Sequence, residues 1–112
     1  MTMLSLAIGS PNDLGVPTEW FTGQIDEVRI WNRALTAMEI MDTYNCELFA
    51  GSGLIASYQF HQGVPSGTNS TETTLLDTSG KGHDGTLAGF ALSGSASNWF
   101  SPGGVTTGNT CP

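Results

Sequence analysis

The alternation of apolar and polar residues is clearest in residues 24–32 (QIDEVRIWN), where it predicts a β-strand. One face of this strand would carry Asp26, Val28 and Ile30, and the other would carry Ile25, Glu27, Arg29 and Trp31. A second apolar run, residues 54–60 (LIASYQF), predicts another strand. Shorter runs predict strands at residues 3–8, 73–76 and 85–92, with clusters of turn-forming residues between them.

A single short helix is predicted from Thr36 to Tyr44. Thr36 suits an N-cap, and Glu39 follows three residues later, which is the spacing of a capping box. The apolar residues of this segment are Met38, Ile40 and Met41. Because two helical turns are marginal alone, we expect these side chains to pack against the sheet.

The order of these elements predicts the fold class. Strands separated by turn clusters, with one brief helix, are typical of a sandwich or jelly roll and not of βαβ units. The 15 glycines and the low charged fraction of 12% agree, because helical surfaces favour charged residues. We therefore predict an all-β fold, an antiparallel β-sandwich of jelly-roll type with one short helix, in a single domain of 112 residues.

The charge balance excludes several partners. Three basic residues (Arg29, Arg33 and Lys81) stand against ten acidic ones, so the formal net charge is -7. Nucleic acids and anionic membranes are therefore not expected to bind. No run approaches the about 20 apolar residues that span a bilayer, and residues 1–8 lack the basic start of a signal peptide. The chain as given is expected in the cytoplasm, or outside the cell or at its surface if it is part of a longer exported protein.

The chain has two cysteines, Cys46 and Cys111, without a CxxC motif or a nearby histidine pair. A metal or redox site built on them is therefore not expected. They form either one long-range disulfide, closing a loop of about 65 residues and worth roughly 4 kcal/mol, or two free thiols. The choice depends on the redox compartment, and both alternatives remain open.

Two segments resemble one known family. Residues 21–40 (FTGQIDEVRIWNRALTAMEI) closely resemble the C-terminal signature of laminin G-like jelly-roll domains, including the pentraxin-like branch, which have the concanavalin A-like fold. Residues 53–63 and 77–87 resemble the opening pattern of the same family. The resemblance implies one module, with the C-terminal signature in residues 1–48, the opening strands in 53–100 and a tail in 101–112. Repeats of secreted bacterial surface proteins and adhesins show similar patterns.

The order of the two patterns is reversed relative to the family, in which the signature of residues 21–40 ends the domain. The chain is therefore expected to span a boundary between repeats or to be a short, permuted version that lacks some middle strands. Missing strands would leave exposed sheet edges or an uncovered face. We therefore expect a homodimer, formed by strand pairing or by sheet-to-sheet contact.

The resemblance also implies a calcium site. Some relatives hold a structural Ca²⁺ near the turn of residues 77–84, which makes Asp26, Asp77 and Asp84 candidate ligands. Alternatively, Asp26 accepts backbone or side-chain hydrogen bonds and shapes a turn, which is the interpretation that we favour. No other cofactor is expected.

Other residues bear on ligand binding and catalysis. Among the Trp and Tyr residues that could stack on sugars, Trp31 and Trp99 are the better candidates for exposure, although large aromatic residues in small domains usually belong to the core. A glucanase of this superfold would need paired carboxylates in an E-x-D-x-x-E strand, but here Gln24 and Arg29 occupy the outer positions around Asp26. No enzymatic activity is therefore expected.

The function predicted from the sequence is that of a non-catalytic binding or adhesion module, with a glycan or another protein as ligand. A purely structural fragment that associates only with itself is the alternative. A degenerate glycoside hydrolase is the third and weakest interpretation.

Overall fold

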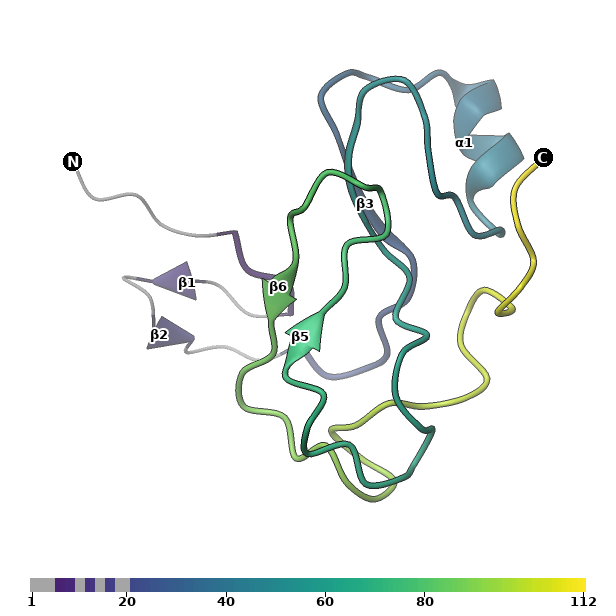
Figure 1. The fold of residues 1–112 in the computed structure, drawn as a ribbon. Coiled ribbons are helices and arrows are strands. Elements are labelled where there is room, and N and C mark those ends of the chain that lie inside the picture. The colour runs from purple at the N-terminus through teal and green to yellow at the C-terminus, as the bar shows by residue number, and fades with distance from the viewer. Residues whose placement is uncertain (1–5, 10–11, 14–15, 18–20) are drawn as a thin grey trace.

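The central element is an antiparallel pair of strands, β3 (Val28–Trp31) and β4 (Leu54–Tyr58), with Val28 opposite Tyr58 and Ile30 opposite Ala56 (Figure 1). The structure is a computed structural model that describes residues 6–9, 12–13, 16–17 and 21–112. A register shift between Ile30 and Trp31 marks a bulge in this pair.

Both central strands are shorter than predicted. The chain leaves the extended region at Glu27 (φ 49°) and at Phe60 (φ 57°), so neither residue can continue a ladder. Predicted strand 24–32 therefore begins only at Val28, and the expected alternation of faces does not extend to Ile25, Asp26 and Glu27.

Two smaller antiparallel pairs complete the sheets. β5 (Thr74–Leu75) pairs with β6 (Gly85–Thr86), and β1 (Asn12–Asp13) pairs with β2 (Val16–Pro17). The predicted strands 73–76 and 85–92 are thus present in shortened form. The predicted strand 3–8 lies partly outside the described residues, and its described part, residues 6–8, is not in a strand.

The helix α1 (Ala37–Thr43) begins as predicted. The Thr36 hydroxyl accepts a hydrogen bond from Glu39 N at 3.1 Å, and Thr36 N donates to Glu39 Oε1 at 3.0 Å, so the capping box is confirmed. The expected packing of its apolar residues on the sheet is wrong, because Met38, Ile40 and Met41 are all exposed.

The core is small. Ala56, Tyr58, Leu75 and Trp99 form its buried cluster, joining β4 to β5 and to the segment after β6. Among the described residues, mostly coil surrounds three two-stranded sheets and one short helix, and no second sheet packs face to face on the first as in a sandwich. Strands of two to five residues bury too few side chains to form two such layers. No helix in this part of the chain has the length and apolarity needed to cross a bilayer.

The C-terminal tail is irregular but attached. A disulfide joins Cys46 to Cys111, which are 65 positions apart, and the tail ends beside α1 (Figure 1). Next to the disulfide, Glu47 N donates to Asn109 O at 2.7 Å and Cys111 N donates to Glu47 O at 2.8 Å. Both backbone groups of Glu47 are therefore hydrogen-bonded to the tail.

Removing the disulfide is expected to destabilise the fold. The double variant Cys46→Ala/Cys111→Ala should lose about 4 kcal/mol of unfolding free energy in the chain-entropy model, because the unfolded chain gains the freedom of a 65-residue loop. Urea denaturation followed by tryptophan fluorescence measures the loss. Reducing agent should shift the wild-type midpoint and leave that of the double variant unchanged; equal midpoints for both oxidised proteins would show that the bridge adds no stability.

Candidate functional site

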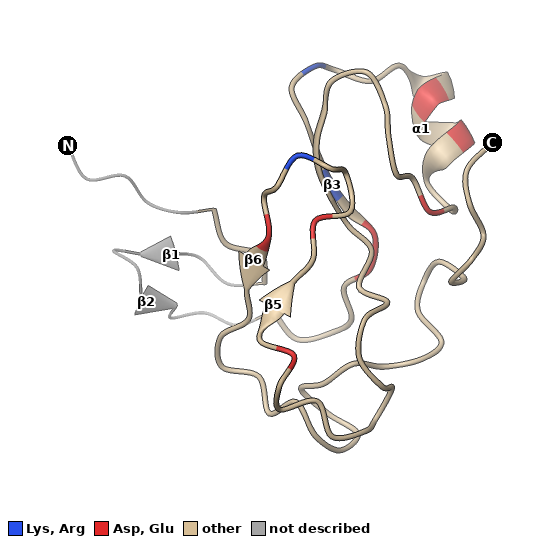
Figure 2. Cartoon of the chain, in the orientation of Figure 1, with Lys and Arg blue, Asp and Glu red and all other residues tan. Residues whose placement is uncertain are grey.

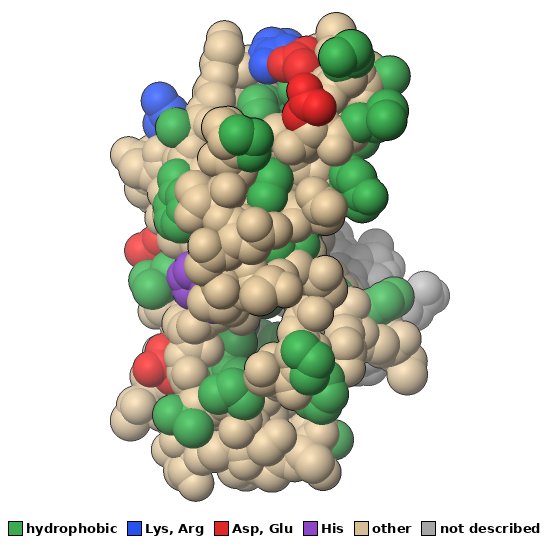
Figure 3. All heavy atoms as spheres, turned by 90° about the vertical axis from the view of Figure 1, so that its right-hand side faces the viewer, with side chains coloured by type: hydrophobic (Ala, Val, Ile, Leu, Met, Phe, Trp, Pro, Cys, Tyr) green, Lys and Arg blue, Asp and Glu red, His purple; other side chains and the backbone are tan. Residues whose placement is uncertain are grey.

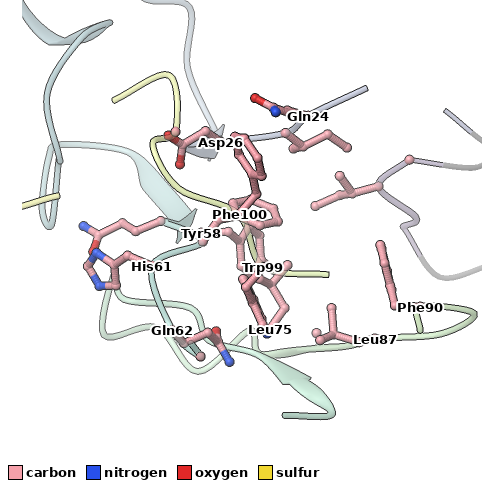
Figure 4. Close-up of a pocket in the computed structure, with 18 of the residues that line it drawn as sticks. Gln24, Asp26, Tyr58, His61, Gln62, Leu75, Leu87, Phe90, Trp99 and Phe100 are labelled. Atoms are coloured by element: carbon pink, nitrogen blue, oxygen red, sulfur yellow. The ribbon is translucent and has the colours of Figure 1, made fainter. Parts of the chain in front are cut away.

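An open cavity of about 1050 Å³ lies beside the core (Figure 4). Most of its walls come from five parts of the chain: residues 6–9, residues 21–26 before β3, residues 58–63 at the end of β4, residues 83–88 around β6, and the segment 97–105. The short strands position these walls, and the coil between them leaves the space open.

Aromatic side chains give the cavity much of its apolar surface. Phe21, Phe90 and Phe100 line it and stay 58%, 51% and 50% exposed. The buried side chains Leu75 and Trp99 line it from the core side. An apolar cavity with exposed aromatic rings is suited to a ligand that offers flat, partly apolar surfaces.

The polar groups of the cavity are mostly fixed by the fold. Gln62 donates to Thr74 O at 2.6 Å and accepts from Leu76 N at 2.9 Å, which ties it to β5. His61 Nδ1 lies 2.6 Å from Glu47 Oε2, and Glu47 Oε1 accepts from Gly108 N at 2.7 Å. Glu47 therefore connects the cavity wall to the tail.

Two buried side chains that line the cavity carry polar atoms without partners among the described residues. Gln59 is 2% exposed, and neither its Nε2 nor its Oε1 has a hydrogen bond; the Nε1 of Trp99 also lacks a partner. A buried polar atom without a partner costs free energy. A ligand or a bound water that formed a hydrogen bond with one of these atoms would offset that cost.

The charge of the cavity is acidic. Asp26, Glu47 and Asp84 line it, and no Lys or Arg is found in the part of the lining that the structure describes. The blue Lys and Arg positions in Figure 2 all lie in the half of the molecule that contains α1 and β3. Anionic ligands are therefore disfavoured, whereas neutral ligands meet no penalty.

Asp77 accepts the hydrogen bonds that hold the turn between β5 and β6 in place. Its fully buried carboxylate accepts from Ser57 N and Ser79 N at 2.9 Å through Oδ1, and from His83 N at 2.9 Å through Oδ2. Burial alone would raise the pKa of Asp77, but these donors outweigh it and hold the pKa at about 2. Asp77 thereby fastens the turn to β4.

The three candidate calcium ligands are not brought together as one metal-binding group in the described part of the chain. Asp77 faces N–H donors, Asp84 Oδ1 accepts from Asp77 N at 2.8 Å, and Asp26 Oδ2 accepts from Val105 N at 2.9 Å. Ca²⁺ requires six to eight oxygen ligands, and no group of three or more His, Cys, Asp or Glu in the described part of the chain could hold a metal ion. Asp26 instead accepts a backbone hydrogen bond, which matches the favoured interpretation, and it anchors the tail.

The two candidate tryptophans lie in different places. Trp99 is only 8% exposed and packs against Phe60 at 6.5 Å between ring centroids, so its expected exposure is wrong; the core cluster covers it. Trp31 is half-buried, with the Arg33 guanidinium 5.4 Å from its ring centroid, and it does not line the cavity.

Sequence reasoning missed the three phenylalanines and Gln59. The stacking candidates were restricted to Trp and Tyr, although Phe90 in the predicted strand 85–92 and Phe100 beside Trp99 offer aromatic rings of the same kind. Gln59 carries a usable signal, since it directly follows the apolar strand β4 and a polar residue there must find partners.

Comparison with known proteins finds one family that matches part of the chain. The family model described as the concanavalin A-like lectin/glucanases superfamily, a laminin G model, matches residues 2–41. The family predicted from residues 21–40 is therefore confirmed by a partial match, which ends within α1 and leaves the resemblance of residues 53–87 a prediction. No curated protein and no solved structure matches the chain.

Replacing Asp77 tests its structural role. Asp77→Ala leaves three backbone donors without their acceptor and is expected to cost about 3 kcal/mol of unfolding free energy. Asp84→Ala, which removes one such bond, is the matched control and should cost about 1 kcal/mol. Because the folded pKa of Asp77 is lowered, its contribution is present above pH 3.8 and is lost as the pH falls through about 2. Urea denaturation measures both variants. Equal losses of unfolding free energy in Asp77→Ala and Asp84→Ala would contradict this structural role of Asp77.

Glu27 is expected to make stability depend on pH. Burial raises its pKa from 4.5 to about 7, despite its ion pair with Arg29 at 3.3 Å. The folded chain then binds this proton more tightly than the unfolded chain, so stability falls as the pH rises from about 4.5 to about 7. Glu27→Gln should remove this component, with an upper bound of about 3 kcal/mol for the difference between pH 4.5 and pH 8. Parallel curves of unfolding free energy against pH for the wild type and Glu27→Gln would contradict this expectation.

Proposed function

We propose that the chain is a non-catalytic binding module that takes a neutral glycan in the cavity. The observation that carries this is the set of exposed phenylalanine rings, from Phe21, Phe90 and Phe100, around a concave and cation-free surface. Sugar rings present apolar faces that stack on aromatic side chains and hydroxyls that pair with amide groups such as that of Gln59. The partial match to a superfamily that includes lectins supports the same ligand class.

We include in this proposal that the module has no catalytic activity. The carboxylates that line the cavity already have fixed partners: Asp26 accepts from Val105 N, Asp84 accepts from Asp77 N, and Glu47 pairs with His61 and Gly108. A retaining hydrolase needs two carboxyl groups free to act on one bond. Their engagement elsewhere supports a role in binding.

The proposal also covers the finer fold and the location of the protein. β3 lies in the segment that matches the family model, and it pairs with β4, whose sequence we interpret as the family's opening strand; this pairing supports a permuted part of a jelly-roll sandwich. The disulfide between Cys46 and Cys111 supports an oxidising compartment, and so a place outside the cell or at its surface within a longer exported protein.

A glycan array of neutral and acidic oligosaccharides, followed by calorimetric titration, tests the ligand. We expect binding to neutral glycans only, and a fivefold to tenfold loss for Phe90→Ala, because one stacking contact contributes about 1 kcal/mol. Val64→Ala removes an exposed apolar side chain outside the cavity lining and should bind as the wild type does. Failure of the wild type to bind any glycan, or equal affinities for both variants, would contradict the proposal.

A second candidate function is a structural unit that associates with itself. One observation favours it: twelve large apolar side chains are exposed among the described residues, against six buried apolar ones. Monomeric proteins rarely leave such surface in contiguous patches without a partner.

A further inference from the structure

The C-terminal tail, residues 101–112, forms one wall of the cavity. The lining residues that it contributes are Ser101, Gly103, Gly104, Val105 and Thr107. The tail contains none of the helices or strands, so contacts with other parts of the chain must hold this wall in position. Figure 4 shows the tail, in pale yellow, passing beside Asp26.

The tail is held with little packing. No residue from 101 to 112 is buried, and only Val105 and Cys111 are half-buried. Figure 3 looks onto the side of the molecule along which the tail runs, and tan atoms, which belong to the backbone and to polar side chains, predominate across its middle. The hydrophobic effect therefore contributes little to the position of this wall.

Hydrogen bonds and one covalent bond hold the tail instead. Near its start, Asp26 Oδ2 accepts a hydrogen bond from Val105 N at 2.9 Å. Near its end, Glu47 binds residues 108–111 through its side chain and both backbone groups, and the disulfide adjoins Glu47. Ordering a segment of this length costs more conformational entropy than a few hydrogen bonds offset. We therefore expect the disulfide to keep the tail in place.

The tail passes very close to Asp26. A Cβ added to Gly103 would lie 2.5 Å from Asp26 Oδ2, the atom that accepts from Val105 N. A Cβ added to the next residue, Gly104, would meet nothing within 4 Å. A methyl group at position 103 would therefore disturb the attachment at Asp26, and the same group at position 104 would not.

Glu47 connects the tail to a second wall of the cavity. Its Oε1 accepts from Gly108 N at 2.7 Å, and its Oε2 lies 2.6 Å from Nδ1 of His61, which lines the cavity after β4. If the tail moves away, this buried carboxylate loses a partner that helps to hold it beside His61. Opening the tail therefore disturbs groups on two walls.

We propose that the tail completes the ligand site as a closing strap, and that the bridge between Cys46 and Cys111 makes ligand affinity sensitive to a dithiol reductant. The reductant supplies two electrons and two protons: one thiolate attacks the bridge and forms a mixed disulfide, which its second thiol then resolves. The S–S bond is thereby broken, both cysteines become thiols, and the reductant ends as its own disulfide. This inference rests on the proposed binding of a glycan in the cavity and adds a regulatory element to it.

Amide hydrogen exchange, followed by NMR, tests the strap without any ligand. After reduction by dithiothreitol, the amides of Val105, Gly108 and Cys111 should exchange at nearly the rate of an unfolded chain, whereas amides of β4 should stay protected at least about a hundredfold. Circular dichroism shows whether the reduced chain is folded. Tail amides that stay as protected as those of β4 would overturn the strap.

Two glycine variants test the same point with the disulfide intact, so they do not depend on the reduced chain staying folded. Gly103→Ala places a methyl group against the Asp26 carboxylate and should speed exchange at Val105 by at least about tenfold. Gly104→Ala, the matched control, adds the same group in open space and should leave exchange at Val105 as in the wild type. Equal exchange in the two variants would overturn the attachment at Asp26.

Calorimetric titration with cellohexaose, a neutral oligosaccharide, tests the effect on affinity. Reduction of the wild type should weaken binding by at least about tenfold, since the ligand then binds only a minor population with a closed tail. Cys46→Ala/Cys111→Ala should bind as weakly as the reduced wild type and should not respond to the reductant. Thr78→Val removes a hydrogen bond to Ser57 O outside the cavity lining, and as the control it should behave as the wild type does.

The outcomes separate this inference from the proposed function. A wild type that binds no glycan, with a tail that opens on reduction, would overturn glycan binding and leave the strap standing. A folded, reduced wild type that binds cellohexaose as tightly as the oxidised form would overturn the strap and leave glycan binding standing. Where reduction unfolds the chain, Gly103→Ala decides: it should bind cellohexaose about threefold more weakly than Gly104→Ala, and equal affinities would overturn the strap.

Discussion

One buried guanidinium determines how the first half of the chain is arranged. Arg29 lies on β3 and donates to the carbonyls of Thr43 and Cys46, at the end of α1 where helical carbonyls lack partners. A cation at that end also suits the helix dipole, and the ion pair with Glu27 offsets part of its desolvation. Because Arg29 requires oxygen partners, it orients the polar side of α1 toward the sheet, and the apolar side is left free.

Features that depend on neighbouring residues could be predicted from the sequence. The capping box of Thr36 and Glu39 is local, because both hydrogen bonds close within one helical turn. The centres of β3 and β4 were also predictable, since their alternating or apolar runs have few other uses. The turn around Asp77 followed from its glycine and serine content, although its hydrogen bonds to Ser57 did not.

Features that depend on distant contacts could not be predicted. The strand ends at Glu27 and Phe60 arise from positive φ angles that no local pattern demands. Trp99 is buried because the chain at Gly63 passes so closely that an added Cβ would lie 2.4 Å from its ring. The outward turn of α1 required knowledge of Arg29 and its partners. The disulfide depends on redox conditions, which the order of the residues does not encode.

The disulfide also determines how the folded chain would transmit a mechanical force. If tension is applied between residue 46 and the C-terminal end, the covalent bridge passes the load from Cys111 directly to Cys46. The intervening loop then carries no force, and this loop contains β4, β5, β6 and most of the cavity wall. The half of the molecule that contains the cavity would keep its shape under a pull that stretches the chain outside it.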